Sequence, residues 1–228
     1  MLSGITSGVT ATAASVPGLY VGTSGWSYPS WRPDFYPAGT KPEDFLHYYA
    51  ERFATVELNT TGYRLPREEL FERWAEQTPP GFQFAPKANA HPRFDAATFA
   101  ARVGLLNERL GPIRLVVGSA RDEGLLTLLL GSFEPTAPLA FDFRHDSWDG
   151  IEADLPSNAV RVNALEADAA FRYVRLREPP YSDDDLRAWA ERLRTPLEEG
   201  VRVYCYFKHE DEPTGPTYAR RLLELLAG

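Results

Sequence analysis

Several short segments of the chain alternate apolar and polar side chains with the two-residue period of a β-strand. The clearest are residues 54–59 (ATVELN), 139–144 (LAFDFR) and 201–208 (VRVYCYFK). In the first of them, Val56 and Leu58 share one face, opposite Glu57. Charged side chains gather toward the carboxyl end of each segment. The pattern therefore predicts strands with one apolar and one polar face, and a site near their carboxyl ends.

Eight segments are predicted strands: Leu19–Thr23, Thr55–Asn59, Phe82–Pro86, Ile113–Gly118, Leu139–Phe143, Val160–Asn163, Tyr173–Leu176 and Val201–Phe207. Amphipathic helices are predicted between several of them. Residues 40–43 (TKPE) have the pattern of a capping box that opens a helix, and Asp95 and Ser182 are candidate caps of two more. Strands that alternate with helices are typical of parallel pairing through βαβ crossovers.

Eight such strands favour one α/β domain, a TIM-type (β/α)8 barrel over residues 18–228. The intervals after strands five and six are too short for full helices, so we expect an irregular barrel with short or missing helices there. An open doubly wound sheet is the alternative. Its central strands would be apolar on both faces, which the alternating pattern disfavours. Residues 1–17 are small and weakly polar, and they predict a flexible N-terminal extension.

Composition narrows the class of protein. The net charge of −8 is unlike the basic footprint of a general nucleic-acid binder, and no apolar stretch approaches the ~20 residues of a membrane span. The one cysteine, Cys205, allows neither a disulfide framework nor a cysteine-based zinc site. The first residues lack the basic and apolar regions of a signal peptide. These features favour a cytoplasmic protein and leave its oligomeric state open.

The face on which a strand residue lies also predicts which side chains line the mouth of the barrel, at the carboxyl ends of the strands. The expected binding residues are Trp26, Asn59, Tyr63, Asp142, Arg144, Trp148, Asn163, Arg175, Tyr206 and Lys208. We expect Arg161 deeper inside and His209 just beyond the last strand. Cations outnumber anions in this set, so an acidic protein would hold a locally positive cup. Arginine suits bidentate binding of carboxylate or phosphate, which indicates a small anionic ligand.

Three residues are candidates for acid–base catalysis. Glu57 ends a strand beside Lys87, where burial and a neighbouring charge tune a pKa, and His145 titrates near neutrality. Lys87 is assigned an electrostatic or proton-transfer role. The structural alternative is a buried ion network, in which Glu57 pairs with Lys87 and Asp142 pairs with an arginine. We expect no cofactor. A divalent metal on Glu57, Asp142 and His145 is a further alternative, and no paired-histidine motif supports it.

A series of short motifs extends from Leu19 to the C-terminus: 22–28 (GTSGWSY), 55–63 (TVELNTTGY), 82–87 (FQFAPK), 143–148 (FRHDSW), 173–176 (YVRL) and 204–207 (YCYF). Together they resemble the domain-of-unknown-function family 72 (DUF72), also called the YecE-like family. The resemblance implies a TIM-type barrel and no particular reaction. It also implies that nine residues occupy the family's motif positions: Glu57, Asn59, Tyr63, Lys87, Arg144, His145, Trp148, Arg175 and Tyr206.

The chain departs from the pattern of this family at five strands, and on strand five Asp142 stands where a glutamate is common. Residues 116–121 (VVGSAR) stand in place of a Gln-Leu-Pro-Pro stretch after strand four, and Asn163-Ala164 in place of Asp-Ser on strand six. Arg177-Glu178 replace His-Gly after strand seven, and Lys208-His209 replace two asparagines after strand eight. The departures imply a ligand that differs from that of typical members, or a lost activity.

The sequence therefore favours an enzyme of unassigned reaction that acts on a small phosphate- or carboxylate-bearing substrate at the barrel mouth. Acid–base chemistry of hydrolase, lyase or isomerase type fits these residues. The alternative is a non-catalytic protein that binds or senses an anion in the same pocket. Nucleic-acid processing is a third hypothesis, and it needs a basic groove around the mouth, which the acidic composition disfavours.

Overall fold

The computed structural model describes residues 16–208 and 212–228. Most of the predicted N-terminal extension and His209 lie outside these ranges. The strands are β1 (Leu19–Thr23), β2 (Thr55–Leu58), β3 (Gln83–Ala90), β4 (Ile113–Val117), β5 (Leu139–Phe143), β6 (Ala159–Arg161), β7 (Phe171–Leu176) and β8 (Arg202–Phe207). The α-helices are α1 (Phe45–Ala50), α2 (Glu68–Glu76), α3 (Ala96–Gly104), α4 (Glu123–Gly131), α5 (Asp183–Glu198) and α6 (Thr214–Ala227).

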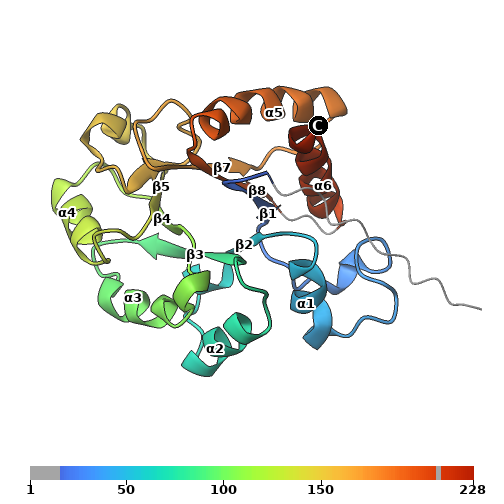
Figure 1. Cartoon of the computed structure of the whole chain (residues 1–228). Helices are drawn as coiled ribbons and strands as arrows, with labels where there is room; N and C mark the ends of the chain where they lie inside the picture. The colour runs from blue at the N-terminus through green and yellow to red at the C-terminus, as the bar shows by residue number, and fades with distance from the viewer. Residues whose placement is uncertain (1–15, 209–211) are drawn as a thin grey trace, which may run out of the picture.

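The strands form two parallel sheets, of order β1-β8-β7 and β2-β3-β4-β5-β6. They lie at the centre of the molecule, with the helices arranged around them (Figure 1). The two sheets approach each other at both edges. Ser24 and Glu57 form an isolated parallel bridge between the ends of β1 and β2. At the other edge, the N–H of Asn163 donates to the carbonyl of Tyr173 at 2.9 Å.

Gly22 allows the close approach of β1 to β2. A Cβ atom at this position would lie 2.1 Å from the carbonyl oxygen of Thr55, far inside van der Waals contact. The Tyr49 hydroxyl joins the same two strands, since it accepts from the N–H of Thr23 at 2.8 Å and donates to the carbonyl of Thr55 at 3.1 Å. Gly22 therefore has a packing role, since only a residue without a side chain fits between the two strands.

Apolar side chains form two separate clusters, one on each side of the strands. The larger packs the strands against the helices and includes Val56, Leu115 and Phe141. The smaller, here called the inner cluster, lies on the opposite strand face and consists of Ala85, Ala140, Val160, Phe171, Tyr173, Tyr204 and Tyr206. Glu57 and Asp142 share strand parity with this second face, because side chains alternate along a strand.

Two of the three predicted N-terminal helix caps are confirmed. The Asp95 carboxylate accepts from the N–H of Thr98 at 3.0 Å, and Ser182 forms a full capping box at the start of α5. The predicted capping box at Thr40 is wrong. A 3-10 turn over Pro42–Asp44 precedes α1, and its flanking residue Lys41 makes no side-chain cap.

The interval between β5 and β6 holds only two 3-10 helices, Asp146–Trp148 and Ile151–Asp154, and no helix lies between β6 and β7. The prediction of short or missing helices after strands five and six is confirmed. Within residues 16–208 and 212–228, no helix has the length and apolar character needed to cross a bilayer.

Candidate functional site

A buried carboxylate, Glu57, lies at the centre of the charged residues. Its side chain is fully enclosed, with 0% exposure. Oε1 accepts from Nη1 of Arg114 at 3.1 Å, and Oε2 accepts from the Tyr173 hydroxyl at 2.8 Å. The Arg175 Nε lies 2.9 Å from the same Oε2. Glu57 on β2 is thus tied both to β4 in its own sheet and to β7 in the other.

The second carboxylate, Asp142 on β5, shares a partner with the first. The Arg114 guanidinium donates to Asp142 Oδ2 through Nη2 and through Nε, the latter at 2.9 Å. Arg144 donates to the same oxygen from Nη2 at 2.7 Å. Arg114 therefore bridges both carboxylates. We call Glu57, Arg114, Asp142, Arg144, Tyr173 and Arg175 the mouth network.

The pKa shifts in this network follow from burial and neighbouring charge. Burial by itself would lower the pKa of Arg114, but the charges of Glu57 and Asp142 raise it above its ordinary value. Burial, followed by the charge of Glu57, holds the pKa of Tyr173 well above 10. Both groups therefore keep their protons through the physiological range, Arg114 as a cation and Tyr173 as a neutral donor.

The charges of other arginines act on Arg144. Burial lowers the pKa of Arg144, and the nearby charges of Arg177 and Arg175 lower it further in spite of Asp142. The buried Nε–H of Arg175 makes no hydrogen bond, because its short contact with Glu57 is an ion pair of poor hydrogen-bond geometry. Arg144 is thus repelled by neighbouring arginines, and Arg175 has one buried N–H donor that makes no hydrogen bond.

Lys87 lies apart from the carboxylates. It is 8% exposed, and its Nζ is 4.3 Å from the ring centroid of Tyr63, which is itself 81% exposed. In the alternative of a buried ion network, the pairing of Glu57 with Lys87 is wrong, because Glu57 takes Arg114 and Arg175 as its partners. The pairing of Asp142 with an arginine is present. A bidentate guanidinium fork matches two carboxylates better than a single ammonium does. Lys87 forms no ion pair within the described residues, and its ammonium group lies against the ring of Tyr63.

Two of the predicted site residues are enclosed away from any ligand. Trp148 is fully buried, stacks on Phe143 at 4.3 Å between ring centroids, and donates from Nε1 to the carbonyl of Ser119. Tyr206 is also fully buried, and its hydroxyl lies 2.8 Å from that of Thr55. Both residues support the walls of the site from within the packed layers.

The other predicted residues lie around the rim. His145 is exposed, and its Nδ1 accepts from the N–H of Ser147 at 3.1 Å at the start of a 3-10 helix. Trp26 is half-buried and lies edge-on to Trp74, while Asn59 is half-buried at the end of β2. Lys208 is exposed directly after β8. The structure therefore does not bring His145 into the mouth network.

Strand β6 has the opposite parity to the prediction. Val160 belongs to the inner cluster, whereas Arg161 pairs with Asp149 at 2.8 Å and with Glu152 at 3.0 Å. The expectation that Arg161 lies inside the mouth is wrong, since carboxylates of the preceding loop hold it outside.

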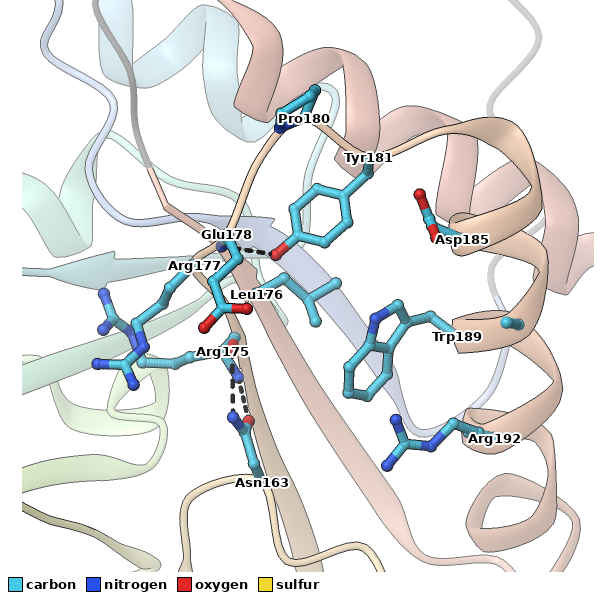
Figure 2. A pocket seen from close by; sticks show the side chains of 11 residues that line it. Asn163, Arg175, Leu176, Arg177, Glu178, Pro180, Tyr181, Asp185, Trp189 and Arg192 are labelled. Atoms are coloured by element: carbon cyan, nitrogen blue, oxygen red, sulfur yellow. Dashed lines mark hydrogen bonds between the residues drawn. The ribbon is translucent and has the colours of Figure 1, made fainter.

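Asn163 supports the network through the backbone. Its Oδ1 accepts from the N–H of Arg175 at 2.7 Å, and its Nδ2 donates to the carbonyl of Arg175 at 3.3 Å (Figure 2). Its φ of 69° lies in the left-handed region, which asparagine tolerates better than most residues do. Asn163 thus fixes the strand segment that carries Arg175.

Sequence reasoning missed Arg114 and Arg177. Arg114 is the one charge in the otherwise apolar segment 113–117 (IRLVV), on the parity opposite to Ile113, Leu115 and Val117. A buried arginine needs compensating charge, so this isolated cation was a usable signal for a carboxylate partner. Arg177 directly follows β7 and lies on the same strand face as Arg175, so the alternation of side chains along the strand could have predicted it.

Metal ligation has no support in the described part of the chain. No group of three or more histidine, cysteine, aspartate or glutamate side chains there is placed to hold an ion. The carboxylates of Glu57 and Asp142 form ion pairs with arginines, and His145 does not contact either carboxylate. The three residues considered for a divalent metal therefore do not form a ligand set.

The fold and the site together define a class: a parallel α/β protein with a buried carboxylate–arginine network at the carboxyl ends of its strands. The chain belongs to the family described as "Protein of unknown function DUF72", which matches residues 20–228.

Two curated relatives from bacteria match part of the chain. The UPF0759 protein YecE of Escherichia coli K12 is 35% identical over 102 residues, which is 41% of this chain and 35% of that protein. The UPF0759 protein YunF of Bacillus subtilis is 33% identical over 70 residues, 31% of this chain and 24% of that protein. The aligned stretches thus span about a third or less of the length of these relatives.

Solved structures support the fold. A DUF72 family protein from Thermotoga maritima superposes with a TM-score of 0.74 at 23% identity, covering 92% of this chain and 99% of that one. A DUF72 family protein from Enterococcus faecalis gives a TM-score of 0.75 at 15% identity, covering 91% and 97%. At these identities the likeness establishes the fold and leaves the reaction open.

Proposed function

We propose that the two sheets form one irregular, closed (β/α)8 barrel within a single domain over residues 18–228, with the mouth network at its carboxyl-end opening. The Ser24–Glu57 bridge, the backbone bond between Asn163 and Tyr173, and the Glu57–Arg175 ion pair all support closure, since each joins the two sheets. Active sites of such barrels lie at this end. A cytoplasmic location fits the buried, unpaired state of Cys205.

On this scaffold the protein is an enzyme that acts on a small phosphate- or carboxylate-bearing molecule. The observation that carries the proposal is the excess of positive charge at the mouth. Two carboxylates, Glu57 and Asp142, lie among four arginines, Arg114, Arg144, Arg175 and Arg177, and Lys87 adds a fifth cation apart from them. An anion would relieve the repulsion that Arg144 experiences from Arg175 and Arg177, which is why binding there is favourable.

Acid–base chemistry falls to Lys87 in this proposal. Glu57 is enclosed and shares both of its oxygens with Arg114, Tyr173 and Arg175, so it is a positioning residue that holds two arginines in place. Lys87 is nearly buried, unpaired in the described structure, and covered by an exposed tyrosine that can move aside. A lysine amine beside a bound substrate can transfer a proton or attack a carbonyl.

Calorimetric titration with methyl phosphate and with acetate tests the anion site. We expect binding at low ionic strength and about 10-fold weaker binding in Arg177→Met, because one of three converging guanidinium groups is removed. Arg187→Met is the matched control, since Arg187 pairs with Asp183 on the exposed side of α5. Failure of both anions to bind the native protein, or equal losses in the two variants, would contradict the proposal.

A non-catalytic anion-binding or sensing protein is the second candidate. The full enclosure of Glu57 favours it, because a carboxylate locked between arginines is a structural group rather than a base. The two functions separate on the fate of the ligand. An anion that stabilises the protein and is recovered chemically unchanged supports binding alone. Turnover that Lys87→Met abolishes, while anion affinity persists, supports the enzyme.

A further inference from the structure

Lysine is rare in this chain, which makes the lysine at position 87 informative. Of its 24 lysine and arginine residues, 21 are arginine and only Lys41, Lys87 and Lys208 are lysine. Arginine also supplies the positive charge of the mouth network, where guanidinium groups pair with carboxylates. In such a chain we expect arginine wherever charge alone is needed. Lys87 therefore has a role that depends on its amine, because an amine can act as a nucleophile and a guanidinium cannot lose its charge.

Lys87 lies on the same strand face as the inner cluster. It follows Ala85 of that cluster by two residues on β3, and side chains alternate along a strand. It is also paired in register with Arg114 on β4. Arg114 donates to Asp142 Oδ2, and Arg144 donates to the same oxygen. Arg114 therefore links Lys87 to Arg144, as the strand neighbour of the first and a partner in the same carboxylate of the second.

The turn after β2 holds the stem of Lys87 in place. This turn, the 3-10 helix Thr60–Gly62, is fixed to β3 by two side chains. The Thr61 Oγ1 accepts from the N–H of Lys87 at 3.1 Å, and the Asn89 Nδ2 donates to the carbonyl of Gly62 at 2.5 Å. A Cβ atom on Gly62 would lie 3.0 Å from Cδ of Lys87 and 3.1 Å from Cε, so the stem packs closely against the turn. An apolar chain would pack there equally well, so packing does not account for the amine.

The amine of Lys87 has a different environment from the stem. Its Nζ forms no ion pair within residues 16–208 and 212–228, and it lies 4.3 Å from the ring centroid of Tyr63. Tyr63 is 81% exposed, so its ring is a cover that solvent surrounds. An amine on a fixed stem, with no carboxylate partner and next to a guanidinium-rich network, is placed to attack an electrophilic carbon.

We infer that Lys87 is the nucleophile of the proposed reaction, and that the substrate is a small aldehyde or ketone that carries a carboxylate or phosphate. The inference rests on the proposed function and names the class of its substrate. The amine lone pair bonds to the carbonyl carbon, and a C=N bond replaces the C=O bond. Of the three protons of the lysine ammonium, two leave with the carbonyl oxygen as water and one stays on the iminium nitrogen. The step therefore needs no oxidant or reductant.

Reductive trapping tests the inference. The protein is incubated with pyruvate or with dihydroxyacetone phosphate and treated with sodium borohydride, which adds hydride to the iminium carbon and leaves a stable secondary amine. Peptide mass spectrometry then locates the adduct among only three lysines. With at least one of the two ketones, we expect about 10-fold more adduct at Lys87 than at the exposed Lys41, because a positioned amine reacts faster than a free one.

Neutral ketones are the control for the anionic group. Methyl pyruvate has the ketone of pyruvate without its charge, and dihydroxyacetone is the corresponding match for the phosphate. We expect each to give about 10-fold less adduct at Lys87 than its anionic counterpart, since it lacks the group that arginine binds.

Lys87→Met is the matched variant, because it keeps an unbranched stem and removes the amine. We expect it to lose the adduct and still to bind acetate or methyl phosphate in the calorimetric titration. The inference is overturned by the absence of an adduct with both anionic ketones, by equal adducts at Lys41 and Lys87, or by equal yields from the neutral ketones. The anion site stands in each of these cases if acetate or methyl phosphate binds the native protein. If neither binds, the proposed function fails as well.

Discussion

Replacing Glu57 by glutamine tests whether the mouth network is held by this one charge. Glutamine keeps the shape of the side chain and removes the anion. Arg175 would lose its only ion-pair partner within the described residues, and Arg114 would be left with Asp142 alone. The new amide N–H₂ would also point donors at donors. With Glu57 at 0% exposure, water cannot compensate for the loss.

The expected loss of stability in Glu57→Gln follows from the number of contacts that are broken. Removing one partner from a buried ion pair costs about 3–5 kcal/mol. Glutamine can still accept one hydrogen bond, from Arg114 or from Tyr173, so we expect about 3 kcal/mol of lost stability. In a chain of this length that corresponds to a fall of about 6–12 °C in Tm. The free energy of unfolding is measured from urea denaturation followed by tryptophan fluorescence.

The control is Glu191→Gln, which breaks an ion pair with Arg194 in which the Glu191 side chain is 69% exposed. Surface pairs contribute little, so this variant should stay within about 0.5 kcal/mol of the native protein. A loss below about 1 kcal/mol for Glu57→Gln would refute the reasoning, because it would mean that Arg114 and Arg175 do not depend on this carboxylate.

Three other perturbations have defined outcomes. Gly22→Ala should cost about 3 kcal/mol or more in urea denaturation, since the added Cβ meets a carbonyl at 2.1 Å, whereas Gly104→Ala meets nothing within 4 Å and should cost nothing. Asn163→Ala should cost about 1–3 kcal/mol, because it removes two hydrogen bonds to the β7 backbone. Stability should fall as pH rises from 10 toward 12: burial raises the pKa of Tyr204 to about 12, so the unfolded chain loses that proton first, and Tyr204→Phe should flatten the fall.

The sequence predicts most residues of the mouth network on those strands whose outer face packs on helices. Burial against helices makes that face apolar, and the polar face is then fixed by parity. Glu57, Asp142 and Arg175 were placed correctly on this basis, and the structure brings all three together. The partner of each charged residue was less predictable, because nothing in a single strand shows whether Glu57 will pair with a lysine or an arginine.

Strand β6 shows where the rule reverses. Its segment 159–162 (AVRV) places Val160 against Phe171 and Tyr204 on the inner face, which is itself apolar at this depth. The polar Arg161 then finds its carboxylates outside. The parity rule assumes that the outer face is apolar because helices cover it. It fails at β6, where the inner face is apolar, no helix follows the strand, and the charged Arg161 lies outside.

The role of Arg114 could not be predicted from one strand, because it depends on the offset between neighbouring strands. It is paired with Lys87 on β3, two residues beyond the position that is level with Glu57. A residue near the start of β4 therefore lies level with the middle of β3 and with the end of β2. No pattern within one strand carries this displacement, since it depends on how neighbouring strands are offset along their axes.

The bridging position of Arg114 has a consequence for how substitutions combine. Because one guanidinium serves both Glu57 and Asp142, the energies of these residues are not separable. A substitution that destabilises the native protein can have almost no effect on stability when the residue with which it pairs has already been replaced. We therefore expect replacements of Arg114, Glu57 and Asp142 to be tolerated better together than one at a time.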